Sequence, residues 1–259
     1  MKENFSCLIL LLIFASPAAS EEIATSLEGP PLQYQEGTLL KGFPVDVVRE
    51  IQARMGNNQA IQVYPWARLY RKALTTPDIV LFTMAKNAER EPHFYWIAKL
   101  TERTSSLYAL KGSTLNLSSI DDAKSIPVVV MRGGNREVFL RKQGFQKIIT
   151  ALDESSSIQM LFNRRAEMVF MSKMEAEILA RQSGFNPEEM QPVMPLYSNT
   201  SFIAISKQGT DKRLINSWVS HFEDMKSDGT FERIANNWIK QIRDNYGIEI
   251  SQTDGVLQF

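Results

Sequence analysis

Arg90 offers the most direct anion-binding chemistry in this 259-residue sequence. Its guanidinium presents a planar fork of N–H donors that matches the two oxygens of a carboxylate. The adjacent acids Glu89 and Glu91 allow a structural alternative, in which Arg90 only forms an ion pair at the surface. If the fold turns Arg90 toward a cavity, we expect it to bind a carboxylate there.

A second candidate for anion binding is the run Gly133-Gly134-Asn135, which opens an expected helix. A helix N-terminus offers unpaired N–H groups and the positive end of the helix dipole, and glycines let a ligand approach the backbone closely. Arg132 and Arg136 would add positive potential if they are not solvated. The structural alternative is an ordinary tight turn with Asn135 as the helix cap.

Glu28, Tyr34 and Trp66 form a looser set of candidates. Glu28 precedes a double proline that must end the first strand, so its carboxylate could meet a ligand ammonium there. The rings of Tyr34 and Trp66 could cover an apolar or cationic side chain of a ligand. Packing in the core is the alternative role for both rings.

The sequence offers little for catalysis or for metal binding. Its two histidines, His93 and His221, are far apart, and Cys7 is the single cysteine. We find no Ser-His-Asp arrangement and no nucleotide-binding loop. We therefore predict no catalytic residue, no metal site and no cofactor.

The composition is that of a globular protein without a general affinity for polyanions. Hydrophobic residues make up 44% of the chain, which excludes a disordered or fibrous protein. The 29 basic and 29 acidic residues cancel, so we expect no binding to nucleic acid or to an anionic membrane surface.

Residues 1–20 read as a secretory signal peptide. Lys2 is followed by an apolar run at 7–15 that is too short to span a bilayer, and Ala18 and Ser20 stand at the positions preferred before cleavage. The alternative is a buried first helix. Cleavage would also remove Cys7, so we expect a soluble, exported protein without disulfides and with an ordinary hydrophobic core.

Alternating strands and helices organise the remaining chain. The first unit reads as β-α-β-α-β, which predicts a parallel sheet. The pattern restarts near Gly112 with a second alternating unit, whose middle helix has three serines available at its N-terminus. The expected elements are strands at 23–26, 59–64, 78–84, 104–110, 127–131, 148–151, 167–171 and 201–206 and helices at 44–55, 66–74, 135–143, 155–163, 173–182, 211–226 and 231–243.

Four motifs in this order resemble the extracytoplasmic (periplasmic) solute-binding proteins of polar amino-acid uptake, bacterial family 3. The resemblance extends over most of residues 23–247. The motifs are PPLQY at 30–34 with GFPVD at 42–46, FTM at 82–84 with AER at 88–90, MRGGN at 131–135, and FIAISK at 202–207 followed by the segment 214–238.

This resemblance implies a fold and a domain division. The fold is α/β, the two-lobed periplasmic-binding-protein fold of type II, with two hinge crossovers near residues 108–111 and 199–205. The first lobe would comprise residues 21–108 and 199–250, and the second lobe residues 109–198. Residues 251–259 are polar and are expected to form a C-terminal tail.

The resemblance also implies roles for individual residues. Arg90 matches the arginine that holds the ligand carboxylate in this family, with groups at Thr83 and Met84 completing the site. Ala85 replaces a residue that often carries a hydroxyl. Ser172 stands where members that bind α-amino acids usually have an aspartate for the ammonium. Because a hydroxyl cannot replace that charge, either Glu28 supplies it or the ligand is not an ordinary α-amino acid.

We therefore expect a monomeric protein that is not an enzyme and that captures an amino acid or a related carboxylate by hinge closure. An inner-membrane permease of an ABC-type importer would be its partner. Two alternatives remain open at this point. One is an orphan binding protein that serves a sensor, and the other is a periplasmic enzyme on the same fold, similar to cyclohexadienyl dehydratase, with Glu28 as its acid or base.

Overall fold

The computed structural model describes residues 21–259. The predicted signal peptide, residues 1–20, lies outside the described residues, so its assignment stays a prediction. Within residues 21–259, none of the helices has the length and apolar character needed to span a membrane.

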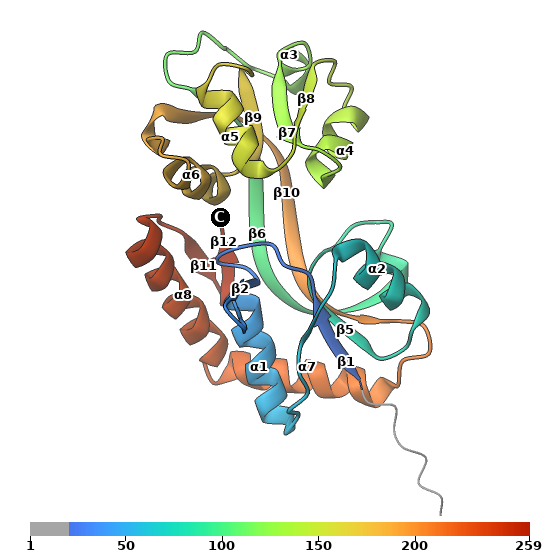
Figure 1. The fold of residues 1–259 in the computed structure, drawn as a ribbon. Helices are drawn as coiled ribbons and strands as arrows, with labels where there is room; N and C mark the ends of the chain where they lie inside the picture. Colours follow the sequence, from blue (N-terminus) through green and yellow to red (C-terminus); the bar gives the residue numbers. More distant parts are fainter. Residues whose placement is uncertain (1–20) are drawn as a thin grey trace, which may run out of the picture.

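Two α/β lobes are joined by a pair of long antiparallel strands (Figure 1). These strands are β6 (Phe94–Leu110) and β10 (Met190–Ser206), and they pair with each other along their whole length. The order of strands in the large sheet is β4-β1-β5-β10-β6-β9-β7-β8. The predicted α/β class and the two-lobed architecture are confirmed.

The first lobe begins with the predicted β-α-β-α-β unit. Strand β1 pairs in parallel with both β4 and β5, as expected for right-handed crossovers. Helix α1 ends at Gly56, whose φ of 67° is the left-handed conformation that glycine adopts most readily. The elements are β1 (Glu22–Thr25), β2 (Tyr34–Glu36), β3 (Leu39–Lys41), α1 (Phe43–Met55), β4 (Gln62–Val63), α2 (Trp66–Thr75), β5 (Ile79–Ala85) and the 3-10 helix η1 (Glu91–His93).

The second lobe repeats the alternation. Strand β7 pairs in parallel with β8 and β9. Helix α5 is capped by Asp153, whose carboxylate accepts a hydrogen bond from the Ser156 amide at 2.6 Å, and not by the serines that the sequence offered. The elements are α3 (Ile120–Ala123), β7 (Val128–Met131), α4 (Asn135–Lys142), β8 (Ile148–Ala151), α5 (Glu154–Phe162), β9 (Met168–Ser172), α6 (Lys173–Gln182) and the 3-10 helix η2 (Pro187–Glu189).

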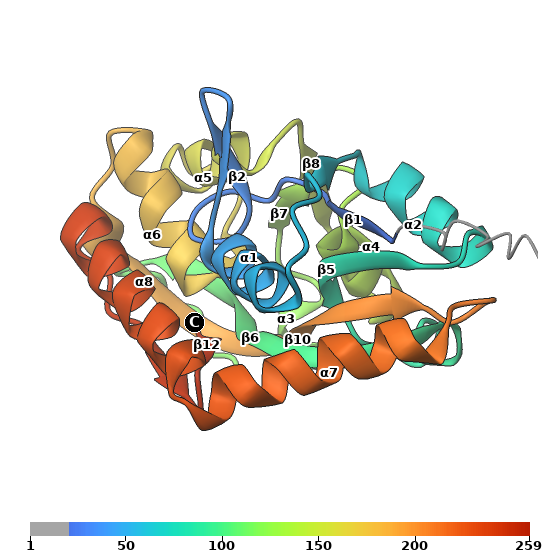
Figure 2. The ribbon, with the colours of Figure 1, turned by 90° about the horizontal axis from the view of Figure 1, so that it is seen from below.

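After β10 the chain returns to the first lobe. Helix α7 (Lys212–Ser227) runs across the base of this lobe, and α8 (Thr230–Tyr246) follows its edge (Figure 2). Trp218 of α7, Phe231 of α8 and Phe43 of α1 belong to one buried cluster on that face of the sheet. The first lobe is therefore completed by segments from both ends of the chain.

The polar tail predicted for residues 251–259 is wrong. These residues form a hairpin of β11 (Ser251–Thr253) and β12 (Val256–Gln258), and β12 pairs in parallel with β6. Leu257 is fully buried, and the backbone of Phe259 exchanges hydrogen bonds with Glu102 and Thr104 of β6. A short strand with one buried side chain produces no run of apolar residues in the sequence. The pattern of hydrophobic residues therefore does not predict this strand.

The passage between the lobes lies in the middle of the two long strands. Strand β10 pairs with β5 of the first lobe from Ser201 onward, and β6 pairs with β9 of the second lobe from Ser105 onward. The first crossover was predicted near residues 108–111. In the structure these residues lie further along the chain, at the end of the part of β6 that pairs with β9 and just after it. The second crossover was predicted near residues 199–205. This range begins just before Ser201, where β10 starts to pair with β5 of the first lobe.

Candidate functional site

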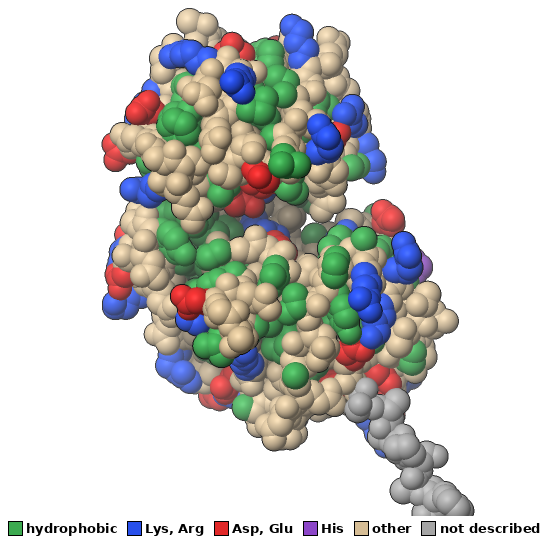
Figure 3. Space-filling view, in the orientation of Figure 1, with side chains coloured by type: hydrophobic (Ala, Val, Ile, Leu, Met, Phe, Trp, Pro, Cys, Tyr) green, Lys and Arg blue, Asp and Glu red, His purple; other side chains and the backbone are tan. Residues whose placement is uncertain are grey.

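A cavity of about 360 Å³ lies between the two lobes. The surface is hollowed at this level, with acidic and basic side chains visible in the recess (Figure 3). The first lobe contributes Ser26, Leu27, Glu28, Trp66, Thr83, Ala85 and Arg90, and the long strands contribute Arg103, Ser105, Tyr197 and Asn199. The second lobe contributes Met131, Gly133, Gly134, Asn135, Arg136, Phe139, Glu154, Phe170, Ser172 and Glu175.

Arg90 lies in the wall of this cavity and is held by aromatic rings. Its guanidinium carbon is 4.9 Å from the centre of the Trp66 ring and 5.2 Å from that of Tyr70. Its Nη1 donates to the carbonyl of Ala85 at 3.1 Å, which leaves further donors of the fork free. Among residues 21–259 no carboxylate forms an ion pair with Arg90, and Glu91 pairs with Lys86 instead. The surface ion pair that the sequence allowed is therefore not formed.

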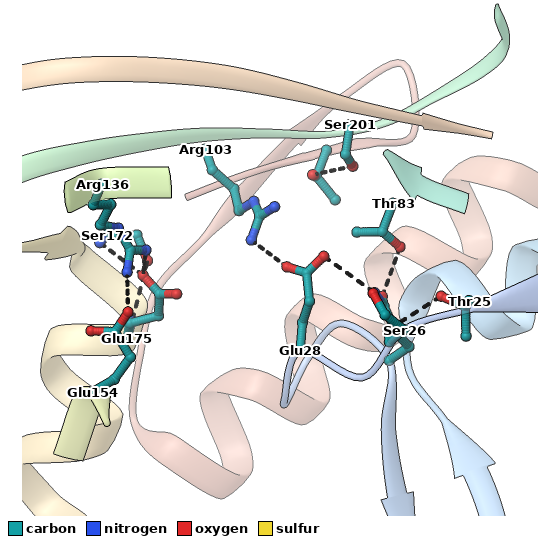
Figure 4. A network of polar contacts seen from close by, with 12 residues as sticks. Thr25, Ser26, Glu28, Thr83, Arg103, Arg136, Glu154, Ser172, Glu175 and Ser201 are labelled. Carbon is teal, nitrogen blue, oxygen red and sulfur yellow. Dashed lines mark hydrogen bonds and ion pairs between the residues drawn. The ribbon is translucent and has the colours of Figure 1, made fainter. Parts of the chain in front are cut away.

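A chain of hydrogen bonds lines the floor of the cavity on the side of the first lobe (Figure 4). The Thr83 hydroxyl donates to Gln33 Oε1 at 2.7 Å, and Gln33 Nε2 donates to Glu28 Oε1 at 3.2 Å. Arg103 Nη1 then donates to Glu28 Oε2 at 2.8 Å. Glu28 is consequently neutralised by Arg103 and not free to meet an ammonium group.

Thr83 has an unusual backbone conformation. Its φ is +64°, in the left-handed region that a β-branched residue rarely occupies, and its side chain is buried. Such strain persists only where surrounding contacts hold it, and it is concentrated at binding and active sites. The hydrogen bond to Gln33 supplies one such contact.

The second lobe presents an arginine between two acids. Arg136 Nη1 donates to Glu154 Oε1 at 2.8 Å, and Arg136 Nη2 donates to Glu175. Glu175 also accepts hydrogen bonds from the amide and hydroxyl of Ser172, at 2.9 and 2.7 Å. Ser172 is thus the buried N-cap of α6 in a capping box. The two acids and one arginine leave this wall with one net negative charge.

Burial and charge act in opposite directions on the two acids. Burial opposes the ionisation of Glu175, but Arg136 and Arg103 outweigh it, so the pKa of Glu175 lies below its usual value of 4.5. Burial dominates at Glu154 and raises the pKa of that carboxyl in spite of Arg136. Glu154 Oε2 is buried and has no hydrogen-bond partner within the described part of the chain.

The glycine turn of the second lobe is partly satisfied by its own helix. The amide of Gly133 donates to Glu137 Oε2 at 2.7 Å, and this hydrogen bond, with Arg141, lowers the pKa of Glu137. Gly134 is the N-cap of α4, and Asn135 is its first residue and not the expected cap. Because Arg136 is ion-paired, the positive potential expected beside this turn is reduced.

The structure brings together most of the predicted site residues in one cavity. Those that line it are Glu28, Trp66, Thr83, Arg90, Gly133, Gly134, Asn135 and Ser172. Two lie elsewhere. Met84 is fully buried in a core cluster with Leu69 and Phe94, and Tyr34 packs at the edge of the other core cluster of the first lobe. The core packing foreseen as an alternative applies to Tyr34, whereas Trp66 packs against the cluster of Met84 and also lines the cavity.

The cavity residues that sequence analysis missed include Arg103, Glu154, Glu175 and Asn199. Arg103 and Asn199 face each other across β6 and β10, where no motif marks them. The Ser172-x-x-Glu175 spacing is a capping-box pattern and could have drawn attention to Glu175.

Comparison with known proteins assigns the chain to a family. Residues 22–241 match the model of bacterial extracellular solute-binding proteins, family 3, and the chain belongs to this family. The comparison with curated proteins gave no match. The match to the family model confirms the resemblance inferred from the four motifs.

Solved structures of the same fold include both sensors and transport proteins. A histidine kinase sensor domain with similarity to periplasmic binding proteins is 15% identical, with a TM-score of 0.70 over 84% of this chain and 96% of its own. A mutant of ArgBP from T. maritima is 20% identical, with a TM-score of 0.67 over 85% and 95%. A putative L-cystine ABC transporter from Listeria monocytogenes is 16% identical, with a TM-score of 0.64 over 84% and 94%. At these identities the likeness shows the fold alone.

Proposed function

We propose that this protein captures a small zwitterionic ligand, an amino acid or a close relative, by closing its two lobes, and presents it to an ABC-type importer. The observation that carries the proposal is the cavity between the lobes, in which Arg90 has no ion-pair partner in the described chain. A ligand carboxylate would satisfy the free donors of that guanidinium. The membership of family 3 supports the same class of function.

The distribution of charge in the cavity favours a ligand with both signs. Three arginines and three glutamates line it, and their formal charges cancel. Pairing is uneven, however. Arg90 leaves one positive charge in the first lobe, while Arg136 cannot neutralise both Glu154 and Glu175 in the second lobe. A ligand with a carboxylate at one end and an ammonium at the other would complement both walls.

Closure supplies the second part of the mechanism. Bringing the lobes together would expel water from the cavity and lower the effective dielectric around the ion pairs. The attraction between Arg90 and a ligand carboxylate would then be stronger than in an open cleft. We infer that the two long strands β6 and β10 act as the hinge, since they alone carry the chain between the lobes in the described structure.

A panel of L-amino acids and organic acids, screened by thermal unfolding, tests the proposal. At a ligand concentration 100 times the Kd, binding stabilises the folded state by about 2.7 kcal/mol and raises the melting temperature by roughly 5–10 °C. We expect such a shift from at least one amino acid. No response from any member, together with no ligand retained on purification, would contradict the proposal.

A sensor partner is the second candidate. The comparison that supports it is the histidine kinase sensor domain, which has the same fold over 96% of its length. Both partners require the same ligand-dependent closure, so the panel does not separate them. A pull-down of the liganded protein with the products of neighbouring genes would separate the two candidates, since it would recover either a permease or a kinase.

A further inference from the structure

Arg103 occupies a position that no motif predicts. It lies on β6 at the passage between the lobes, opposite Asn199 of β10. Its side chain is 13% exposed and lines the cavity. In Figure 4 it stands between Glu28 of the first lobe and the acids of the second lobe.

The contact between Arg103 and Glu28 is specific and rigidly supported. Arg103 Nη1 lies 2.8 Å from Glu28 Oε2, while the other oxygen of Glu28 accepts from Gln33. Gln33 is itself fully buried, and its carbonyl accepts the backbone amides of Glu28 and Gly29. The carboxylate of Glu28 is thereby fixed in one place with both oxygens occupied.

Glu28 is the single acid that the first lobe contributes to the cavity. With Arg103 bound to it, this wall carries the net positive charge of Arg90. Without Arg103, the Glu28 carboxylate would face the cavity without an ion-pair partner. Because an unpaired, partly buried charge is costly, the cavity would then favour a ligand with a positive charge at this position. The identity of residue 103 therefore controls what charge the wall accepts.

We propose that Arg103 is a specificity-determining residue, which excludes ligands with a cationic side chain by withholding the Glu28 carboxylate from them. The inference rests on the proposed function, since it concerns the ligand class of the same cavity. Arg103 also acts on the far wall, because its charge helps Arg136 to keep Glu175 ionised.

Two isosteric amino acids test the inference. L-Arginine carries a guanidinium and L-citrulline carries a neutral ureido group of nearly the same shape, so their affinities differ mainly through charge. We would measure both by calorimetry in the wild type and in Arg103→Met, Arg103→Lys, Glu28→Gln and the Arg103→Met/Glu28→Gln double variant. Thermal unfolding of each variant would establish that it folds.

The ratio of the two affinities is the decisive readout, because a merely structural role would change both affinities together. We expect Arg103→Met to shift the ratio toward arginine by about tenfold or more, Arg103→Lys to keep the wild-type ratio, and the double variant to return to it within about threefold. An unchanged ratio in Arg103→Met, or an equal shift in the double variant, would overturn the inference.

The outcome also separates this inference from the proposed function. If the wild type responds to other members of the amino-acid panel but no variant gains affinity for arginine relative to citrulline, the inference fails and the proposed function stands. If the wild type and every variant respond to no amino acid, the proposed function fails and the inference fails with it.

Discussion

The Arg90 guanidinium lies 4.9 Å from the centre of the Trp66 ring, in the wall of a cavity that both side chains line. The ring fixes the plane of the guanidinium without neutralising its charge, as an acid would. This arrangement leaves a positioned cation without an ion-pair partner in the described chain. Opposite it, the second lobe holds Arg136 between two carboxylates.

Removing the Arg90 charge should abolish most of the affinity. In Arg90→Met we expect the Kd for the panel ligand with the largest thermal shift to rise by about 30-fold or more, since loss of one partner from a desolvated charge pair costs roughly 2 kcal/mol or more. Arg68→Met is the matched control, because Arg68 stacks on Tyr64 at 5.0 Å but does not line the cavity. Equal losses in the two variants, measured by calorimetry, would contradict the role of Arg90.

The strained backbone of Thr83 predicts an unusual order of stabilities. Thr83→Ala loses the hydrogen bond to Gln33 and keeps a positive φ, so its unfolding free energy should fall by about 1–3 kcal/mol. Thr83→Gly loses the same bond but adopts this φ without strain, so it should be about 1 kcal/mol more stable than the alanine variant. Urea denaturation measures both, and a glycine variant less stable than the alanine variant would argue against strain.

The two acids of the second lobe should differ in their effect on stability at neutral pH. The pKa of Glu175 is lowered in the folded state, so its ionised form adds stability above its unfolded pKa that is lost as the pH falls through the folded pKa. Glu175→Gln should therefore lower the unfolding free energy at pH 7 by roughly 2–3 kcal/mol. The deficit should shrink as the pH falls below about 4.

The ionised carboxylate of Glu154 should lower the stability of the folded state, in contrast to that of Glu175. Its pKa is raised in the folded state by burial, so ionisation at neutral pH costs stability, which is recovered as the pH falls through the raised pKa. We expect Glu154→Gln to be as stable as the wild type at pH 7, within about 1 kcal/mol, or more stable. Chemical denaturation at pH 7 and pH 4 compares the two variants, and a larger loss for Glu154→Gln than for Glu175→Gln would refute this assignment.

The C-terminal hairpin should contribute to stability. At Gly255 an added Cβ would stand 2.2 Å from Phe231 Cδ1, and φ is +81°. Gly37 has a φ of +61° and nothing within 4 Å of such a Cβ, so Gly37→Ala tests backbone strain alone. We expect Gly37→Ala to lower the melting temperature by about 2–4 °C and Gly255→Ala by roughly twice that or more, because overpacking adds about 1–3 kcal/mol. Equal effects in calorimetry would mean that the hairpin is not packed on α8.

The two alternating units of the fold could be predicted from the sequence because each element carries a local signal. Apolar runs mark β5, β7 and β9, and Gly56 marks the end of α1. The two 17-residue strands could not be predicted at full length. Their buried face changes along the strand, and β10 contains Pro192 and Pro195, which sit beside shifts in its pairing with β6.

The candidate site was predictable where a motif or a local pattern of residue types marked it. Arg90 and the Gly133–Gly134 turn were predicted, and the structure places them in one cavity. Arg103 and Glu154 could not be found in this way, since their roles depend on ion pairs between segments that are 75 and 18 residues apart in the chain. Met84 was assigned by motif position, whereas the alternation of side chains along β5 turns it into the core.

A crystal structure with the amino acid that gives the largest thermal shift would test the central claim most directly. We predict that the ligand lies between the lobes, with its carboxylate within 3.2 Å of the Arg90 guanidinium and with contacts to residues of the second lobe. A ligand bound elsewhere, or bound in the cavity with its carboxylate turned away from Arg90, would contradict the account.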